Sequence, residues 1–402
     1  MQKFLRNFDL GIFLPTLVLI VVGLFAVYSA TYLTSSSYFS KQLIYAFLGI
    51  VLIVSIVLIP YKIIYEFSYL LYVLSLLLLL LVFFMGVKGF GAERWLAIGP
   101  MRLQPSEFAK IATVLAVARY LSQNDRNINE WKHLAVVFLM ILIPFMLIAK
   151  QPDLGTSLVF LALIIPMLYM AGISWFFLFV ITTPIITMIV AFNLYAFMGW
   201  MLLLLIILIL ARQKGIVKFG VFLMHIAVGV ITPVLWKTLR PYQQQRILTF
   251  LQPEKDPRGA GYQIIQSKVA IGSGGVWGKG FLQGSQSHLN FLPAHHTDFI
   301  FSVIGEEQGF VGIVLILMVF AFLFLYLLYL SNQVKSSFAR LSLVGLMTIL
   351  LFHTLINIAM TIGLAPVTGL PLPFLSYGGS FLLTSCLLIG ITMNFSKNRY
   401  HI

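Results

Sequence analysis

Eleven apolar runs constrain this chain more than any other feature of its sequence. A helix needs about 20 apolar residues to cross the hydrocarbon core of a bilayer. Runs of roughly this length lie near 10–30, 42–60, 65–86, 106–121, 133–149, 157–172, 174–196, 216–236, 299–330, 341–365 and 377–395. We therefore expect an all-α polytopic membrane protein.

The composition excludes a water-soluble fold. Hydrophobic residues make up 60% of the 402 residues and charged residues only 9%, against roughly 45–50% and about 25% in soluble proteins. So few charges could not cover the surface of a soluble protein of this length. The single cysteine, Cys386, cannot form an internal disulfide and lies in an apolar run, so it indicates no redox compartment.

A shorter apolar run at 199–211 decides the expected number of helices. Counting it gives twelve helices, whereas a re-entrant pair over 174–211 would leave ten. Either even number places both termini on the same side of the membrane. The basic cluster ARQKGIVK at 211–218 favours an inner loop after 211, and therefore twelve helices.

The positive charges indicate the orientation of the chain. With both termini inside, the inner segments hold about twice as many Lys and Arg residues as the short outer segments. We therefore expect cytoplasmic N- and C-termini. This placement also explains the net charge of +14. Basic residues do not alternate with aromatic ones as in a nucleic-acid surface, so we expect no nucleic-acid partner.

Residues 237–298 form a long segment unlike the rest of the chain, rich in glycine and mixed in charge. Such a loop in a compact fold is usually functional or disordered, and apolar residues such as Ile264 and Trp277 argue against disorder. We expect short amphipathic helices on the outer membrane surface, folded over a cavity. The stretch GSGGVWGKG at 272–280 is not a phosphate loop, because Ser273 replaces its first glycine and Gly280 its Ser or Thr.

The twelve acidic residues are rare enough to assign one by one, since an ionisable group at membrane depth is costly and a functional candidate. Four of them, at inner helix ends, are explained as caps or interface charges: Asp9, Glu66, Asp125 and Glu130. Glu93, in an outer loop, has no assignment. The remaining seven cluster on the outer side: Glu107, Asp153, Glu254, Asp256, Asp298, Glu306 and Glu307.

Several of these outer acids keep two interpretations. Glu107 and Lys110 lie three residues apart, on one helix face, and form either a structural ion pair or part of a cavity for an anionic headgroup. Asp153 caps the next helix or contacts substrate. Asp298 could bind a metal together with the preceding histidines, but a cap of helix 299–330 is favoured. The helix dipole explains Glu306 and Glu307 in the same helix.

Asp256 also keeps two interpretations. It belongs either to a polar turn around Pro257 or to a site that presents a carboxylate to substrate at the membrane surface. In the second case nearby cations would hold phosphates. These cations are Arg240, Arg246, Arg258 and Lys268. Motifs of zinc proteases, serine hydrolases and zinc ribbons are absent from the sequence.

Five motifs, in order along most of the chain, resemble the SEDS family (shape, elongation, division and sporulation). They are QPSEFAK at 104–110, QPDLGTS at 151–157, DPRGAGYQIIQSKVAIGSGGVWGKG at 256–280, LPAHHTDFIFSVIGEEQG at 292–309 and PLPFLSYGGS at 371–380. IIQSKVAIGSGG is more similar to the elongation branch, RodA, than to the division branch, FtsW. Between 175 and 241 the chain is longer than the family's ten-helix pattern by about one helical pair, which we place at 174–211.

The resemblance implies a peptidoglycan glycosyltransferase that polymerises lipid II on the outer face of the cytoplasmic membrane during cell elongation and shape maintenance. It implies a class B penicillin-binding protein as partner, beside membrane lipids and undecaprenyl-linked glycan. The family's essential aspartate corresponds to Asp256, and its further site residues to Glu107, Lys110 and Asp153. We expect one membrane domain over 1–402, with the active site on the loop 237–298.

The resulting hypothesis makes Asp256 the general base for the acceptor sugar's 4-hydroxyl, with undecaprenyl pyrophosphate as leaving group and inversion at the anomeric carbon. The candidate residues for binding the substrate are Glu107, Lys110, Asp153, Arg102, Arg246, Arg258 and Lys268. The sequence establishes no cofactor; a divalent cation, Mg²⁺ or Mn²⁺, on the pyrophosphate stays an alternative, in which Asp256 would be its ligand instead. The alternative function is a lipid II flippase or another transporter of lipid-linked substrates; a carrier would place ionisable groups near the midplane.

Overall fold

The computed structural model describes residues 8–33, 36–89, 92–98, 101–123, 128–239, 241–255, 260–285 and 295–399. Helices cover all twelve apolar runs: α2 (Leu10–Thr31), α3 (Ser36–Leu58), α4 (Tyr61–Met85), α5 (Pro105–Leu121), α6 (Trp131–Lys150), α7 (Leu154–Met170), α8 (Trp175–Val190), α9 (Leu194–Leu210), α10 (Gly215–Thr238), α14 (Ile300–Gln333), α15 (Ser337–Thr361) and α16 (Gly379–Lys397). Eight helices in the described part are long and apolar enough to cross a membrane. The expected helical membrane fold is confirmed, while the number of crossings stays a prediction.

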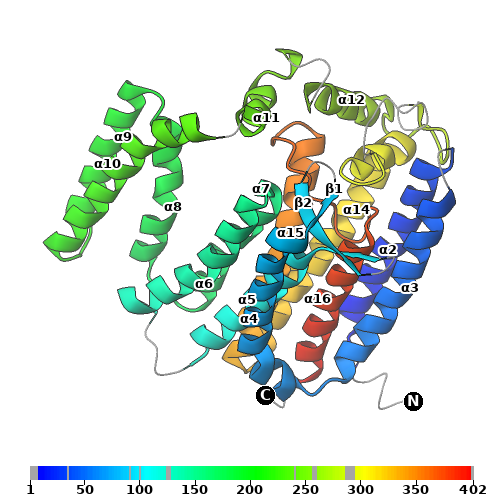
Figure 1. The fold of residues 1–402 in the computed structure, drawn as a ribbon, viewed down its shortest axis with the longest axis horizontal. Coiled ribbons are helices and arrows are strands. Elements are labelled where there is room, and N and C mark those ends of the chain that lie inside the picture. The colour runs from blue at the N-terminus through cyan, green and yellow to red at the C-terminus, as the bar shows by residue number, and fades with distance from the viewer. Residues whose placement is uncertain are drawn as a thin grey trace.

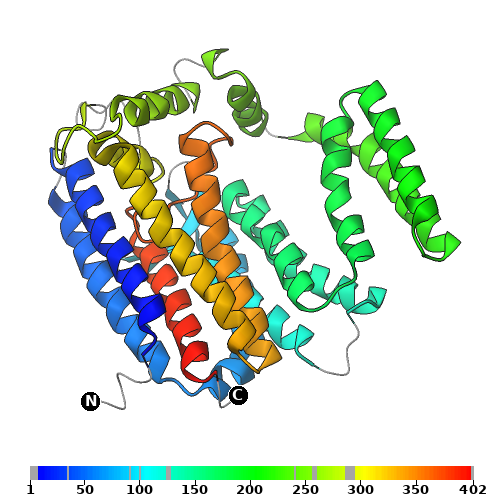
Figure 2. The ribbon, with the colours of Figure 1, turned by 180° about the vertical axis from the view of Figure 1, so that it is seen from behind.

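The main bundle surrounds α5, α15 and α16, as Figures 1 and 2 show from opposite sides. These three helices are buried along most of their length. Alanines of α5, among them Ala109, Ala112 and Ala116, are buried. Such small side chains allow close approach of neighbouring helices in a membrane, and α5 packs against both α4 and α15. Charged residues near the start of α5 are therefore enclosed by protein.

The two ends of the chain meet at one end of this bundle. Asp9 caps α2 by accepting a hydrogen bond from the Gly11 amide (3.0 Å), which confirms its predicted role. The same carboxylate accepts hydrogen bonds from Tyr326 (2.8 Å) and from Ser396, near the end of α16. We call the opposite end of the bundle the distal end. If the chain crosses the membrane an even number of times, the start of α2 and the end of α16 lie on the same side, which agrees with this arrangement.

Helices α8, α9 and α10 stand away from the main bundle in both views (Figures 1 and 2). They share a small apolar core of their own. Inside it, His225 of α10 is fully buried and bonds to Thr183 and Thr187 of α8. Trp200 of α9 donates to the Thr187 hydroxyl (2.8 Å), so a polar cluster joins all three helices. Helices α8 and α9 occupy the segment 174–211; its identification as an addition to the family pattern stays a prediction.

A small sheet interrupts the helices between α4 and α5. Strands β1 (Val87–Gly89), β2 (Ala92–Ile98) and β3 (Met101–Leu103) pair antiparallel in the order β1-β2-β3. Sequence analysis placed Glu93 in an outer loop without a helical pattern, and in the structure this residue belongs to β2. The sheet brings Arg94 toward the start of α7, where the candidate site lies.

Two short helices of the long segment 237–298 lie across the distal end of the bundle (Figure 1). They are α11 (Pro241–Leu251) and α12 (Ala260–Ser273), with a 3-10 turn at Pro253–Lys255. α12 packs against α14. The Ser267 hydroxyl lies 2.6 Å from that of Ser302 and donates to the Thr361 carbonyl (2.6 Å). The predicted short helices are present; their position on a membrane surface over a cavity stays a prediction.

The glycine-rich stretch after α12 binds an internal carboxylate instead of a phosphate. Lys279 Nζ lies 2.7 Å from Glu306 Oε1, and the Lys279 amide donates to the Glu306 carbonyl (3.0 Å). The Gly280 amide donates to the Glu307 carbonyl (3.0 Å). Helix α14 breaks at Gly309, which has a φ of 66°, and an added Cβ there would lie 2.3 Å from the Gly278 amide nitrogen. Glu306 and Glu307 thus anchor the loop, a role that the dipole interpretation did not include.

We predict that Gly278→Ala destabilises the protein. Gly278 has a φ of +80°, and a Cβ there would lie 2.1 Å from the Glu307 carbonyl oxygen. Both the backbone strain and the clash oppose alanine, so the free energy of unfolding should fall by about 1–3 kcal/mol. Thermal unfolding in detergent measures this. Gly272→Ala is the matched control, since nothing lies within 4 Å of its added Cβ; equal melting temperatures for the two variants would contradict the prediction.

Candidate active site

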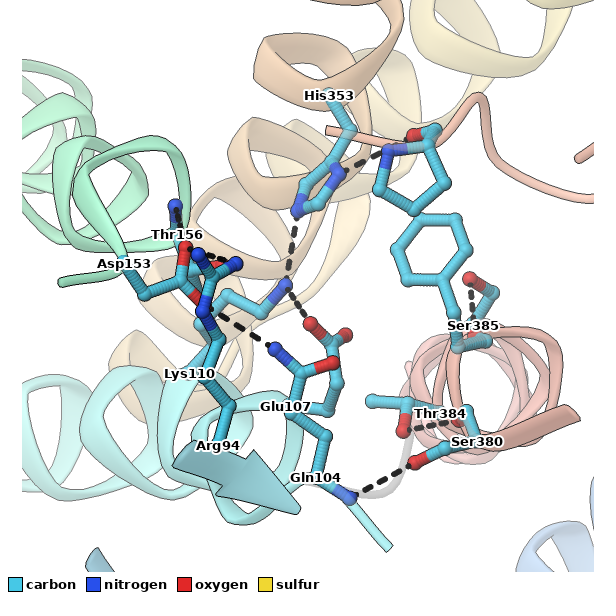
Figure 3. A network of polar contacts seen from close by, with 12 residues as sticks. Arg94, Gln104, Glu107, Lys110, Asp153, Thr156, His353, Ser380, Thr384 and Ser385 are labelled. Carbon is cyan, nitrogen blue, oxygen red and sulfur yellow. Dashed lines mark hydrogen bonds and ion pairs between the residues drawn. The ribbon is translucent and has the colours of Figure 1, made fainter. Parts of the chain in front are cut away.

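The candidate site consists of two connected groups of polar side chains at the distal end. The outer charge cluster contains Arg94, Asp153, Arg246 and Asp298. The buried lysine group contains Glu107, Lys110 and His353. Figure 3 shows Arg94 and Asp153 of the outer charge cluster beside the buried lysine group.

The buried lysine group is almost sealed from solvent. The Glu107 and Lys110 side chains are 4% and 1% exposed, and Lys110 Nζ lies 2.9 Å from Glu107 Oε1. On its other side Nζ lies 2.8 Å from His353 Nε2 of α15, and 5.7 Å from the centre of the Phe381 ring. The adjoining recess has a volume of about 10 Å³, room for about one water molecule. The predicted pair is therefore present, and the recess that described residues line beside it is smaller than a lipid headgroup.

Asp153 connects the two groups. It caps α7 by accepting from the Thr156 amide (3.2 Å), which confirms the cap interpretation. Its carboxylate also pairs with Arg94 (3.4 Å) and accepts from the Gln104 side chain (3.3 Å). Gln104 precedes α5, two residues before Ser106, and so ties the outer cluster to the helix that carries Lys110 (Figure 3).

Asp298 does not cap α14, so that prediction is wrong. The residue at the cap position is Phe299, and no side chain there bonds to the helix. Asn357 of α15 holds the chain differently, donating to the carbonyls of Asp298 (2.9 Å) and Leu370 (2.8 Å). The Asp298 side chain instead lies within the electrostatic reach of Arg246 and Arg94.

The surroundings of Asp298 favour its protonated form. Although the residue keeps some accessible surface, protein atoms enclose its carboxyl group. Burial raises its pKa to about 6, and Asp153 adds to the rise, while Arg246 and Arg94 oppose it. This carboxyl group therefore changes charge close to physiological pH.

The structure describes only some of the remaining predicted site residues. Arg246 is a half-buried residue of α11 and belongs to the outer cluster. Lys268 of α12 lies against Gly363, where an added Cβ would be 2.2 Å from its Cε. Asp256, Arg258 and the side chain of Arg102 lie outside the described residues, so their roles stay predictions. The binding of Mg²⁺ or Mn²⁺ also stays a prediction. The described residues contain no group of three or more potential metal ligands.

Sequence analysis missed Arg94, Gln104 and His353. Gln104 is part of the motif QPSEFAK, but its side chain is uncharged, and the candidates were selected by charge. Arg94 follows Glu93 in a segment without a recognised pattern. His353 is a single histidine in an apolar run, and only the packing of α15 against α5 places it beside Lys110.

We predict that Asp298→Asn changes how stability depends on pH. Between its ordinary pKa and about 6 the folded protein binds a proton here that the unfolded chain has lost, so stability falls as pH rises through this window. The neutral amide has no such dependence. The free energy of unfolding of the variant, relative to wild type, should therefore rise by up to about 3 kcal/mol between pH 4 and pH 7. Melting temperatures of both proteins across this range measure the change. The control Glu66→Gln changes an exposed carboxylate; a constant difference for Asp298→Asn would contradict the prediction.

Comparisons with known proteins cover nearly the whole chain. The family model of FtsW, RodA and SpoVE, described as cell cycle protein, matches residues 10–200 and 195–401. Peptidoglycan glycosyltransferase MrdB of Escherichia coli K12 is 37% identical over 391 residues, which cover 96% of this chain and 94% of MrdB. A chain of a peptidoglycan synthase complex that coordinates polymerization and crosslinking has a TM-score of 0.77 at 30% identity, with 98% and 99% of the two chains covered.

A second solved structure supports the same relationship. The rod shape determining protein RodA of Thermus thermophilus has a TM-score of 0.66 at 26% identity, with 98% of each chain covered. The similarity thus extends over both the main bundle and the distal segments that hold the candidate site. The chain belongs to the FtsW, RodA and SpoVE family, which is the family that its sequence motifs resemble.

Proposed function

We propose that this multi-pass membrane protein is a peptidoglycan glycosyltransferase. The observation that carries the proposal is its similarity to MrdB, a protein of this activity, over almost all of both chains. The outer charge cluster supports it, because two arginines and two carboxylates from four separate segments converge at one end of an otherwise apolar bundle. Polar groups at such a position suit a substrate that has both a lipid and a charged, sugar-bearing part.

The substrate that we propose is lipid II, at the outer face of the cytoplasmic membrane. Both termini would then be cytoplasmic and the distal end external, as the distribution of basic residues favours. Arg94 and Arg246 are suited to the pyrophosphate, because a guanidinium group binds phosphate oxygens through two hydrogen bonds at once. Asp153 holds Arg94 in place by an ion pair. Lys110 would act from beneath, through its ammonium group, which Glu107 holds in place.

In the proposed reaction Asp256 takes the proton of the acceptor sugar's 4-hydroxyl. The hydroxyl oxygen forms a bond to the anomeric carbon of the lipid-linked donor, and the bond from that carbon to the pyrophosphate oxygen breaks. Undecaprenyl pyrophosphate leaves with the bonding electrons, and one displacement inverts the anomeric centre. A positioned base contributes about 10²–10⁴-fold to such a step, and arginine charge stabilises the leaving group.

A class B penicillin-binding protein is the proposed partner. The structural similarity to a chain of a peptidoglycan synthase complex supports this. A crosslinking partner at the external face would receive the glycan strand where it is made.

The first test of the proposed function is Asp256→Asn, which keeps the shape of the side chain and removes the base. The purified variant, incubated with lipid II, should make less than about 1% of the wild-type glycan, as expected for loss of general-base catalysis. Glu254→Gln, two residues away, is the control and should polymerise normally. Normal glycan ladders from Asp256→Asn would refute the base. A wild-type protein that moves lipid II across vesicles without making glycan would instead establish the transporter alternative.

A second test concerns the pyrophosphate. Arg246→Gln removes a cation of the outer cluster and should raise KM for lipid II about tenfold, since a charged hydrogen bond contributes about 1.5–3 kcal/mol. Lys335→Gln, an exposed change between α14 and α15 at the opposite end of the bundle, serves as control. Initial rates at several lipid II concentrations separate KM from kcat. An unchanged KM would remove Arg246 from the site.

A further inference from the structure

His353 of α15 lies within hydrogen-bond distance of the Lys110 ammonium group. It is 1% exposed. Its Nε2 atom lies 2.8 Å from Lys110 Nζ, and its Nδ1 atom lies 3.3 Å from the carbonyl oxygen of Pro371. The imidazole ring also packs against Phe381, with ring centres 4.9 Å apart. Figure 3 shows the His353 ring beside Lys110, with a dashed line for their contact.

These two contacts determine which nitrogen carries the proton. A carbonyl oxygen only accepts hydrogen bonds, so Nδ1 must be the donor to Pro371. An ammonium group only donates, so Nε2 must be the unprotonated acceptor for Lys110. Both contacts are therefore satisfied by one neutral tautomer of His353, with its proton on Nδ1, and by no charged form.

We propose that His353 is a positioning residue for Lys110, and that it fixes the ammonium group between α5, α15 and the segment 371–380. The inference rests on the proposed role of Lys110 in the reaction. Lysine has three N–H donors on a flexible four-carbon chain. Glu107 takes one donor and His353 a second, so together they fix the direction of the third.

Charge explains why a neutral acceptor suits this place. The Lys110 ammonium and the Glu107 carboxylate already balance each other in a buried setting. A second carboxylate would give the group a net negative charge and repel an anionic substrate above it. A neutral imidazole accepts the hydrogen bond and leaves the balance unchanged.

The same face of α15 connects this group to the outer charge cluster. Asn357 follows His353 by four residues and so lies on the same side of the helix. His353 holds the Pro371 carbonyl, while Asn357 holds those of Leu370 and Asp298. The two side chains thereby fix the start of the segment 371–380 relative to both Lys110 and Asp298.

The test compares variants that remove both hydrogen bonds with one that keeps them. His353→Leu and His353→Phe lose acceptor and donor, and kcat for glycan synthesis should fall about 10–100-fold, as for a misplaced catalytic group. His353→Gln keeps an acceptor oxygen and a donor amide and should stay within about threefold of wild type. If both apolar variants fail to fold, His353→Asn replaces them, since its shorter amide cannot reach both partners.

The control is His225→Leu, which removes another buried histidine from the separate helices α8–α10 and should leave kcat unchanged. Melting temperatures identify any variant that has merely unfolded. The proposal is overturned if the variants without both contacts work at the wild-type rate, or if a folded His353→Gln is as slow as they are. Lys110→Met separates the two proposals: an inactive Lys110→Met beside an active His353→Leu refutes only the positioning role, while an active Lys110→Met refutes the role of Lys110 itself.

Discussion

The buried ion pair of Lys110 and Glu107 is the constraint on which the arrangement of the distal end depends. A charge taken out of water is tolerated only when a partner and further hydrogen bonds satisfy it. Lys110 is 1% exposed, so α5 must bring Glu107 within reach, and α15 must supply His353 on the other side. The helices α5 and α15 cannot shift past one another without breaking the contact between Lys110 and His353 and leaving a buried N–H donor unpaired. This contact therefore fixes the register of α5 against α15.

The other buried carboxylates follow the same rule, and each one fastens a different part of the chain. Glu306 binds Lys279 and so attaches the glycine-rich loop to α14. Glu307 accepts a hydrogen bond from Ser29 and joins α14 to α2. Asp9 connects the two ends of the chain through Ser396. In a bundle with so few charges, each buried acid acts as a specific contact between segments that apolar packing alone would leave free to slide.

The helices could be predicted from sequence, whereas much of the site could not. Hydropathy is a local property, so the twelve apolar runs coincide with twelve helices and Asp9 and Asp153 cap the helices that they precede. The strand β2 offered no such signal, because it pairs with two separate segments of the chain, β1 and β3.

Asp298 shows why local patterns fail at the site itself. An acid placed before a helix is usually its cap, but Asn357, almost sixty residues later, determines how the chain enters α14. His353 is a similar case, since nothing near it in the sequence indicates a lysine partner. The motif resemblance located Glu107, Lys110 and Asp153, yet the side chains that orient them come from other elements. Such contacts exist only once the helices have packed, and sequence spacing within one helix cannot reveal them.

The helices α8–α10 show that the same principle operates away from the site. Their apolar surfaces face outward as much as inward, so apolar packing alone would define their arrangement poorly in a membrane. His225, Thr183, Thr187 and Trp200 provide directional hydrogen bonds at one depth. These hydrogen bonds join each of the three helices to a specific neighbour, and the residues that form them all belong to α8, α9 and α10. Because the three helices pack chiefly on one another, their packing does not constrain the positions of Lys110, Asp153 or Asp298.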